Sequence, residues 1–429
     1  MPTPSERTPK RILMIAYHFP PFSGSSGIQR TLSFTRYLPA HGWQPIILTA
    51  QERAYPQVSL ESLSDVPPRV IVSRAFALDS ARHLSMKGRY FQFTALPDRW
   101  LSWVLGAVPS GLSLIRKYRP SVLWSTFPIA TAHLIGLILH RITGLPWVAD
   151  FRDPMTEGEV GVSRHFPENP TVWKARRWVE KLTVRHCTRA VLVSPGALEI
   201  YSKRYSEVSR SQWSLISNGY DEDSFLKAER LGESTRLNGH PITLIHSGLL
   251  YPTMGDRNPS AFFRALEMLK SQGKISPARV KVILRASGSE SEFEQLIRKH
   301  GIKDIVSLEP SIPYTHALAE MLQAGGLLVF QGPISNPNIP AKLYEYIRAR
   351  RPILALVDPA GNTAEVLREV GTGTIVSIDN ASEIADGLLS FLDQVGTGVA
   401  PVHSIETALG YSRESRTAEL AQILDEIAD

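Results

Sequence analysis

The chain contains one cysteine and no long hydrophobic run. Among its 429 residues Cys187 is the only cysteine, so an intrachain disulfide is excluded and a reducing compartment is favoured. No segment reaches the roughly 18 to 20 consecutive apolar residues that a membrane-spanning helix needs. The apolar run at residues 12–17 is too short for the core of a signal peptide and is better explained as a strand. We therefore predict a cytoplasmic protein that is soluble or peripheral to a membrane.

The motifs of two common nucleotide-binding classes are missing. No Gly-x-Gly-x-x-Gly fingerprint occurs, which argues against a nicotinamide cofactor, and no Gly-Lys-Ser/Thr loop occurs, which argues against a P-loop enzyme. No motif for binding DNA or RNA is present, so no nucleic-acid partner is expected. The formal net charge of +6 and the pI of about 9.3 favour phosphates or an anionic surface as partners.

What the chain does contain is a repeated alternation of apolar strands and amphipathic helices. This pattern predicts an α/β fold with two Rossmann-like, doubly wound parallel sheets that face each other across a ligand-binding cleft. The predicted N-terminal domain covers residues 1–220, and a polar stretch with little periodicity at residues 221–241 is predicted to be a linker. The second domain covers residues 242–405. An amphipathic helix within residues 406–429 is expected to pack back on the first domain.

The most informative segment is residues 333–346. Its two prolines and two asparagines before the last proline indicate a loop, and Pro340 suits an early position of the helix that follows. Lys342 and Glu345 would then lie on the first turn of that helix, where free backbone N–H groups attract phosphate. Because residues 353–357 read as the next buried strand, the segment predicts a parallel-sheet unit with a ligand site where the loop meets the helix.

In each domain, a glycine-containing turn follows the first predicted strand. In the first turn, Gly24 and Gly27 would let the backbone approach a ligand closely and direct amides at an anion. A tight turn without a ligand is the alternative. In the second domain Gly248 occupies the corresponding position, and Arg257 after it is a candidate clamp for a diphosphate.

Tryptophan and basic residues concentrate between residues 82 and 119. Trp100 and Trp103 lie in an apolar run that is interrupted at Pro109, among seven lysines and arginines. Tryptophans beside cations are typical of an interfacial membrane-binding face, so this region predicts binding to an anionic membrane surface. The alternative is an ordinary core helix with a solvated basic rim.

Several motifs, taken in order, resemble the retaining glycosyltransferases of the GT-B fold, specifically the family-4-like enzymes that build bacterial polysaccharides. The resemblance covers nearly the whole chain. It rests on residues 17–21 with Gly24 and Gly27, residues 147–154, residues 216–221, and Gly248, Lys342, Glu345 and residues 371–373.

The resemblance implies that a nucleotide diphosphate sugar, the donor, binds to the second domain. Glu345 matches the glutamate that holds the ribose hydroxyls, and Lys342 and Arg257 would neutralise the diphosphate leaving group. The complete set of implied donor-binding residues is Gly24, Gly27, Gly248, Arg257, Asn338, Lys342 and Glu345.

The same resemblance implies residues that act on the sugar and the acceptor. His133 matches a histidine that these enzymes place near the donor sugar, and a structural histidine is the alternative. Asp150 and Asp153, also taken as catalytic, and Arg152, taken as acceptor-binding, lie at the end of a predicted strand. A buried Asp–Arg pair is the alternative for this group.

The chain departs from the family pattern at two places. The family has two glutamates separated by seven residues, but the position eight before Glu345 is Pro337. Asn336 or Asn338 would have to supply the missing contact to the sugar. In addition, Gly248-Leu249-Leu250 replaces the usual Gly-Arg-Leu, so the cation near the diphosphate must come from elsewhere.

The implied reaction is retaining transfer of a sugar from a nucleotide diphosphate sugar to a hydroxyl of a glycan or lipid-linked acceptor, in polysaccharide or cell-surface glycan synthesis. Enzymes of this kind generally work without a bound metal, so neither a metal nor another cofactor is expected. A sugar-nucleotide epimerase of the same fold is one alternative. A non-catalytic subunit of a polysaccharide assembly complex is the other, because the first glutamate is missing.

Overall fold

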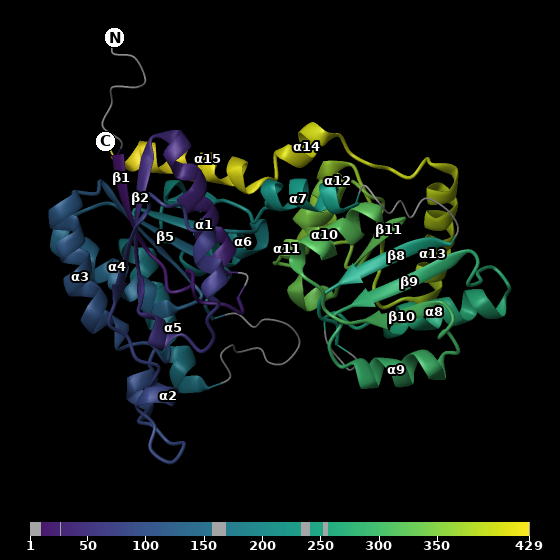
Figure 1. Ribbon diagram of the computed structural model, residues 1–429, viewed down its shortest axis with the longest axis horizontal. Helices are drawn as coiled ribbons and strands as arrows, with labels where there is room; N and C mark the ends of the chain where they lie inside the picture. Colours follow the sequence, from purple (N-terminus) through teal and green to yellow (C-terminus); the bar gives the residue numbers. More distant parts are fainter. Residues whose placement is uncertain (1–9, 26, 157–168, 233–240, 252–255, 429) are drawn as a thin grey trace, which may run out of the picture. The chain divides into compact units, whose positions relative to one another are not determined.

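The computed structural model describes residues 10–25, 27–156, 169–232, 241–251 and 256–428. These residues divide into two compact units (Figure 1). One unit holds the described residues up to 218 together with those from 413 onward, and the other holds residues 219–412. Each unit contains one parallel sheet with helices packed on it. The predicted α/β class with two doubly wound sheets is confirmed.

The first unit is built on a seven-stranded sheet of order β3-β2-β1-β4-β5-β6-β7, in which every paired strand is parallel. The strands are β1 Lys10–Ile15, β2 Trp43–Ala50, β3 Ile71–Ala75, β4 Val122–Thr126, β5 Trp147–Arg152, β6 Arg189–Leu192 and β7 Trp213–Leu215. The helices are α1 Gly27–Tyr37, α2 Ser80–His83, α3 Trp103–Tyr118, α4 Ala130–Thr143, α5 Pro170–His186, α6 Pro195–Arg204 and α15 Arg413–Ala428.

The second unit is built on a six-stranded sheet of order β10-β9-β8-β11-β12-β13, also parallel. Its strands are β8 Ile242–Ser247, β9 Val280–Arg285, β10 Val306–Glu309, β11 Gly326–Gln331, β12 Ile353–Val357 and β13 Thr374–Val376. Its helices are α7 Glu222–Gly232, α8 Ser260–Ser271, α9 Glu290–Lys299, α10 Tyr314–Gln323, α11 Ala341–Ala349, α12 Asn362–Val370, α13 Ala381–Thr397 and α14 Ile405–Leu409.

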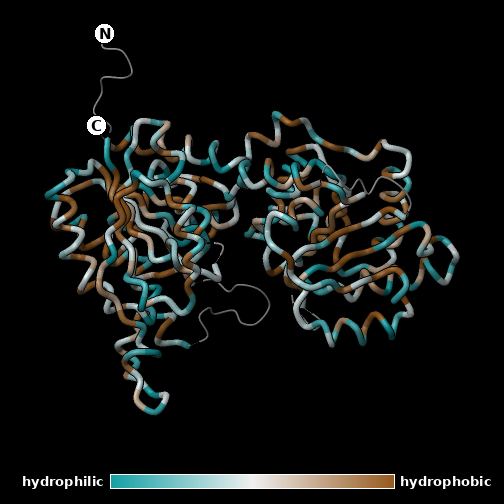
Figure 2. The backbone as a smooth tube through the Cα atoms, viewed as in Figure 1, coloured by the Kyte–Doolittle hydropathy of each residue, from teal (hydrophilic) through white to brown (hydrophobic). Residues whose placement is uncertain are grey.

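Both faces of each sheet are buried, which explains why the strands are continuous apolar runs. On β1, Leu13 and Ile15 pack in one hydrophobic cluster while Ile12 and Met14 pack in the cluster on the opposite face, and none of the four is exposed. Figure 2 shows the hydrophobic residues concentrated along the strands. The order of strands reverses between β1 and β4 and again between β8 and β11, so each sheet has a crevice at its carboxyl edge.

The segment predicted to be a linker contains a helix. Residues 222–232 form α7, whose Phe225 and Ala228 are fully buried in the second unit. Arg348 of α11 holds α7 in place through ion pairs to Glu222 and Glu229. The many charges of this segment are therefore one face of an amphipathic helix. The rest of the predicted linker up to residue 240 lies outside the described residues.

The tryptophans predicted to face a membrane belong to the core. Trp103 is fully buried, and the indole of Trp100 packs against the same hydrophobic cluster and donates to the carbonyl of Ala54 at 3.2 Å. Helix α3 also continues through Pro109, which was expected to interrupt it. One proline removes a single backbone hydrogen bond, and the packed face of α3 keeps the helix intact. Among the described residues, no helix is both long and apolar enough to cross a membrane.

Helix α15 belongs to the first unit although it ends the described chain. Leu420 and Leu424 are buried in the cluster that covers one face of the first sheet. The carboxylate of Asp425 accepts from the indole of Trp43 at 3.1 Å. The last helix is thus fixed by both apolar packing and a polar contact.

Candidate active site

The loop before α11 is held by polar groups at the carboxyl end of β11. The buried amide of Gln331 donates to the carbonyls of Ser335 and Asn338 at 2.6 and 2.9 Å. The backbone N–H of Ser335 donates to a carboxylate oxygen of Asp256 at 3.0 Å. Pro340, with φ of −65°, is the residue before the helix. These contacts position the start of α11 at the crevice between β8 and β11.

Lys342 reaches from α11 to the end of β8. Its Nζ lies 3.1 Å from Nε2 of His246, and a Cβ added to Gly248 would lie 2.9 Å from the same Nζ. Gly248 has φ of +114°, a conformation that favours glycine. The backbone angle therefore favours glycine here, and any other residue would also displace the ammonium of Lys342 from its position.

His246 is a polar residue in an otherwise apolar strand. Its ring is fully buried and its Nδ1 lies 2.8 Å from the carbonyl oxygen of Leu328. A carbonyl only accepts, so Nδ1 carries the proton and Nε2 accepts from the Lys342 ammonium. Burial and the positive charge of Lys342 lower the pKa of His246, which keeps the ring neutral in this role.

The ammonium of Lys342 titrates near neutrality. Burial, then repulsion from Arg257, lowers the pKa of Lys342 to about 7, while the charge of Glu345 opposes the shift. Lys342 and Arg257 thus bring two positive charges to the start of α11, whose first backbone N–H groups also favour an anion. The site is electrostatically prepared for a negatively charged group.

Glu345 lies one turn after Lys342. The helix begins at Ala341, so Glu345 lies in its second turn, because one turn of an α-helix holds only about 3.6 residues. The prediction that Glu345 occupies the first turn is therefore wrong. The hydroxyl of Tyr314, at the start of α10, donates to Glu345 at 2.7 Å and orients the carboxylate. Tyr314 was not identified from the sequence.

Two asparagines of the loop have different environments. The side-chain amide of Asn336 donates to Asp358 at 2.6 Å. The side-chain oxygen of Asn338 is buried and accepts no hydrogen bond from the described residues. Asn338 is therefore better placed than Asn336 to supply the contact that the missing glutamate leaves open.

In the first unit, Gly24 and Gly27 surround the start of α1. Gly24 has φ of +89°, and a Cβ at Gly27 would lie 2.5 Å from Nη1 of Arg152 and 2.7 Å from Nδ1 of His18. Arg152 itself has φ of +59°, at a shift in register between β5 and β6. Burial, then the charge of Arg152, lowers the pKa of His18 to about 3. His18 belongs to the motif at residues 17–21, but it was not predicted as a site residue.

Asp150 forms a buried ion pair with Arg30. It is fully buried, and both carboxylate oxygens accept from Arg30 of α1, at 2.8 and 3.1 Å. Arg30 also donates to the carbonyls of Ile216 and Ser217, at 3.0 and 3.1 Å. The partner of Asp150 is therefore Arg30, not Arg152, and this network favours the buried-pair alternative over a catalytic role.

His133 and Asp153 lie in different surroundings. His133 is fully buried, its Nδ1 lies 2.7 Å from Oγ of Ser125, and its ring packs 4.9 Å from that of Phe151. Burial lowers its pKa to about 3, so this placement favours a structural histidine. Asp153 is partly buried beside Arg152, and burial raises its pKa against the opposing charges of Arg152 and Arg30.

The structure brings the predicted residues together in two groups. Gly248, Arg257, Lys342 and Glu345 gather at the start of α11 in the second unit, with Asn338 in the preceding loop. Gly24, Gly27 and Arg152 gather at the start of α1 in the first unit. The group at the start of α11, with the two cations Lys342 and Arg257 and the carboxylate of Glu345, has the chemistry of a phosphate site next to a hydroxyl-binding group.

Comparison with known proteins agrees with this description. Residues 26–219 match the model of the glycosyl transferase 4-like domain. A glycosyltransferase from Rickettsia africae is 15% identical, with a TM-score of 0.64 over 98% of this chain and 99% of that one. Sucrose-phosphate synthase from Thermosynechococcus elongatus is 16% identical, with a TM-score of 0.61 over 97% and 98% of the two chains.

A third similar structure is HepE from Anabaena in complex with UDP-glucose. It is 13% identical, with a TM-score of 0.62 over 97% of this chain and 99% of that one. A search of curated protein sequences gives no significant match. The shared architecture of these structures is the GT-B fold.

Proposed function

We propose that this chain, a glycosyltransferase of the GT-B fold with a glycosyl transferase 4-like domain at residues 26–219, transfers a sugar with retention from a nucleotide diphosphate sugar to a hydroxyl group. The observation that carries the proposal is the cluster at the start of α11, where Lys342 rests between His246 and Gly248. The acceptor is a glycan or a lipid-linked glycan of polysaccharide or cell-surface synthesis.

The proposed donor contacts follow from the charges of the cluster. Lys342, Arg257 and the first N–H groups of α11 bind the diphosphate. Glu345, oriented by Tyr314, accepts from ribose hydroxyls, and Asn338 contacts the sugar. HepE was crystallised with UDP and with UDP-glucose, which makes uridine nucleotides the first candidates.

The proposed mechanism uses these residues mainly on the leaving group. As the bond from the anomeric carbon to the diphosphate breaks, negative charge grows on the diphosphate and an oxocarbenium-like sugar forms. Lys342 and Arg257 stabilise that growing charge without a metal ion. In the first unit, Arg152 and Asp153 contact the acceptor. The support for this role is that Arg152 lies beside the glycine turn at Gly27.

A thermal-shift screen tests the donor site. The full-length protein is melted with UDP, GDP, ADP, CMP and their common sugars, with and without a chelator, because a ligand of the native state raises the Tm. One nucleotide class is expected to raise the Tm of the native protein and of Glu369→Ala, an exposed glutamate of α12, but not of Glu345→Ala.

Other outcomes of the screen separate the alternatives. No shift with any nucleotide would favour a non-catalytic subunit of an assembly complex. A shift that needs a divalent cation would contradict the metal-free site. A nucleotide sugar that is converted to its epimer without an acceptor would identify an epimerase.

Donor binding is expected to depend on pH around neutrality. Only the protonated Lys342 attracts the diphosphate, and its pKa is about 7, so affinity falls as the pH rises through that value, by up to about tenfold per pH unit. Arg257→Gln removes a charge that lowers this pKa and moves the fall to higher pH. Glu345→Gln removes a charge that raises it and moves the fall to lower pH.

Titration calorimetry with the nucleotide sugar found in the screen measures this dependence. A nucleotide sugar is used because its diphosphate does not itself titrate near neutrality. Displacement of the two variants in the same direction, or a flat profile for the native protein, would show that Lys342 does not set the pH dependence.

The proposed acceptor also bears on localisation. A lipid-linked acceptor would bring the enzyme to the inner face of the cell membrane, and the net charge of +6 favours an anionic surface. We therefore propose peripheral association with that surface.

A further inference from the structure

Three large apolar side chains are exposed in a short hairpin after α2. Met86 is 80% exposed, Phe91 75% and Phe93 67%. The two phenylalanine rings stack with their centroids 5.6 Å apart. Met86 and Arg89 pair as a β-bridge, with N···O distances of 2.8 and 3.1 Å, and close the turn. Residues 84–93, here called the hairpin tip, therefore present an ordered apolar surface to solvent.

The ionised groups of the hairpin tip have one sign. Lys87 and Arg89 lie at the turn and are exposed, and no acidic residue occurs between positions 80 and 93. The preceding acidic residue, Asp79, is fully buried and paired with Arg99. Aromatic side chains beside cations, with no carboxylate nearby in the sequence, are typical of surfaces that enter the interface of an anionic bilayer.

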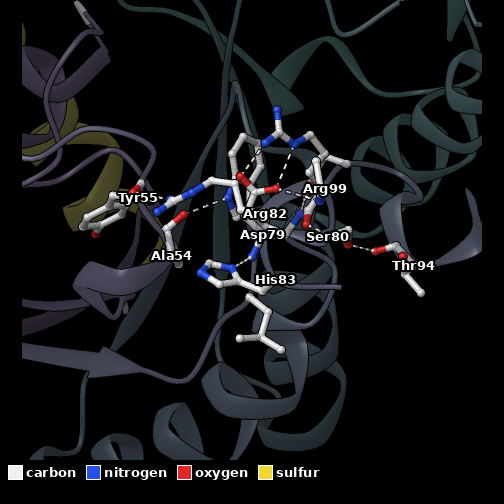
Figure 3. A network of polar contacts seen from close by, with 12 residues as sticks. Ala54, Tyr55, Asp79, Ser80, Arg82, His83, Thr94 and Arg99 are labelled. Atoms are coloured by element: carbon white, nitrogen blue, oxygen red, sulfur yellow. Dashed lines mark hydrogen bonds and ion pairs between the residues drawn. The ribbon is translucent and has the colours of Figure 1, made fainter. Parts of the chain in front are cut away.

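The base of the hairpin is rigid. Asp79 caps α2 by accepting from the N–H of Ala81 at 3.0 Å, and it accepts from Arg99 at 2.8 Å (Figure 3). On the other side, the hydroxyl of Ser80 donates to the carbonyl of Thr94 at 2.6 Å. Hydrogen bonds and an ion pair thus fix both ends of the tip. The exposure of its phenylalanines is therefore a property of the folded structure.

We propose that the hairpin tip docks the enzyme on an anionic lipid surface, with Phe91 and Phe93 in the interface and Lys87 and Arg89 at the phosphate headgroups. This rests on the proposed use of a lipid-linked acceptor, and it assigns the docking to residues other than the tryptophans of α3. A lipid surface fits better than a folded partner, because Figure 1 shows the segment after α2 projecting from the first unit as a narrow loop, and a narrow projection offers little area for a stable protein interface.

Vesicle sedimentation tests the proposal on the full chain. The vesicles are phosphatidylcholine alone or phosphatidylcholine with phosphatidylglycerol. Native protein is expected to bind the anionic vesicles in a salt-sensitive way. The double variant Phe91→Ser and Phe93→Ser is expected to bind the anionic vesicles at least about tenfold more weakly. The double variant Lys87→Glu and Arg89→Glu is expected to bind both vesicle compositions equally.

A matched control removes two exposed apolar side chains elsewhere. Ile142→Ser with Val399→Ser changes residues that are 59% and 69% exposed, and this variant is expected to bind like the native protein. Equal binding by the Phe91 and Phe93 variant, or no binding of native protein to anionic vesicles, would overturn the proposal. A native dimer that the variant converts to monomer without any change in vesicle binding would instead assign the tip to self-association.

The nucleotide response is measured on the same samples. A variant that fails on vesicles but keeps the nucleotide-induced rise in Tm supports docking by the tip and leaves the donor site unaffected. If nucleotide raises the Tm of the native protein but the protein binds neither vesicle type, the docking proposal is overturned and the donor-site proposal is not. Loss of the nucleotide response in native protein is a failure of the proposed transferase site, which vesicle binding does not decide.

Discussion

Lys342→Ala is expected to lower the kcat/KM of sugar transfer by about 100- to 1000-fold, the usual effect of removing one preorganised group that stabilises charge in a transition state. The ammonium is held between His246 and the backbone of Gly248, so it is already positioned before the diphosphate leaves. Release of nucleoside diphosphate from the donor, measured with saturating acceptor, gives the rate.

The matched control is Lys281→Ala. Lys281 is an exposed lysine of β9 in the same unit, and its loss is expected to leave the rate within about twofold, as for other isolated surface charges. Similar rates for Lys342→Ala and Lys281→Ala would show that Lys342 does not act on the leaving group.

Arg30→Ala is expected to destabilise the first unit by about 3–5 kcal/mol, because it leaves the buried carboxylate of Asp150 without its ion partner. Urea unfolding followed by tryptophan fluorescence measures this effect. All eight tryptophans lie between positions 43 and 213, within the first unit, so the signal reports on that unit alone.

A surface ion pair of the same unit provides the control. Arg185 pairs with Glu207 at 3.4 Å, and both side chains are about half exposed, so Arg185→Ala is expected to cost less than about 1 kcal/mol. If Arg30→Ala left the unfolding curve unchanged while abolishing transfer, the catalytic role first predicted for Asp150 would be favoured again.

The fold could be predicted because its information is local. A strand buried on both faces, such as β1 or β12, must be a continuous apolar run, and the helices between such runs are recognisable by period. Helix α7 was not recognised within the predicted linker, because its apolar residues Phe225 and Ala228 are few among many charges. Their burial depends on helices that lie far away in the sequence.

The site could be predicted only in part for the same reason. Motif order identified Lys342, Gly248 and Arg257, but not the partners that give them their chemistry. His246 and Lys342 are 96 residues apart, and Arg30 and Asp150 are 120 apart. A histidine within an apolar strand was the one local sign of the first pair. No local sign distinguished Arg30 from other helical arginines.

The membrane prediction was based on the composition of a region, and composition does not show which residues of that region are exposed. Tryptophans and cations are concentrated between positions 82 and 119, yet the tryptophans fill the core beneath α3. The most exposed large apolar side chains of this region are Met86, Phe91 and Phe93 of the hairpin tip and Leu105 of α3. Which side of a segment faces solvent is decided by tertiary packing, and the sequence alone carried no sign of it.

Hydrogen–deuterium exchange of the full chain, with and without the nucleotide that raises its Tm most, tests most directly whether the donor diphosphate binds at the start of α11. Exchange is expected to slow in peptides that cover residues 333–346 and 242–250, because the diphosphate would cover the first N–H groups of α11 and order Lys342 against Gly248. The Lys342→Ala protein is expected to lose that protection and Lys281→Ala to keep it. Protection confined to other segments, with none at residues 333–346, would contradict a donor site at this helix.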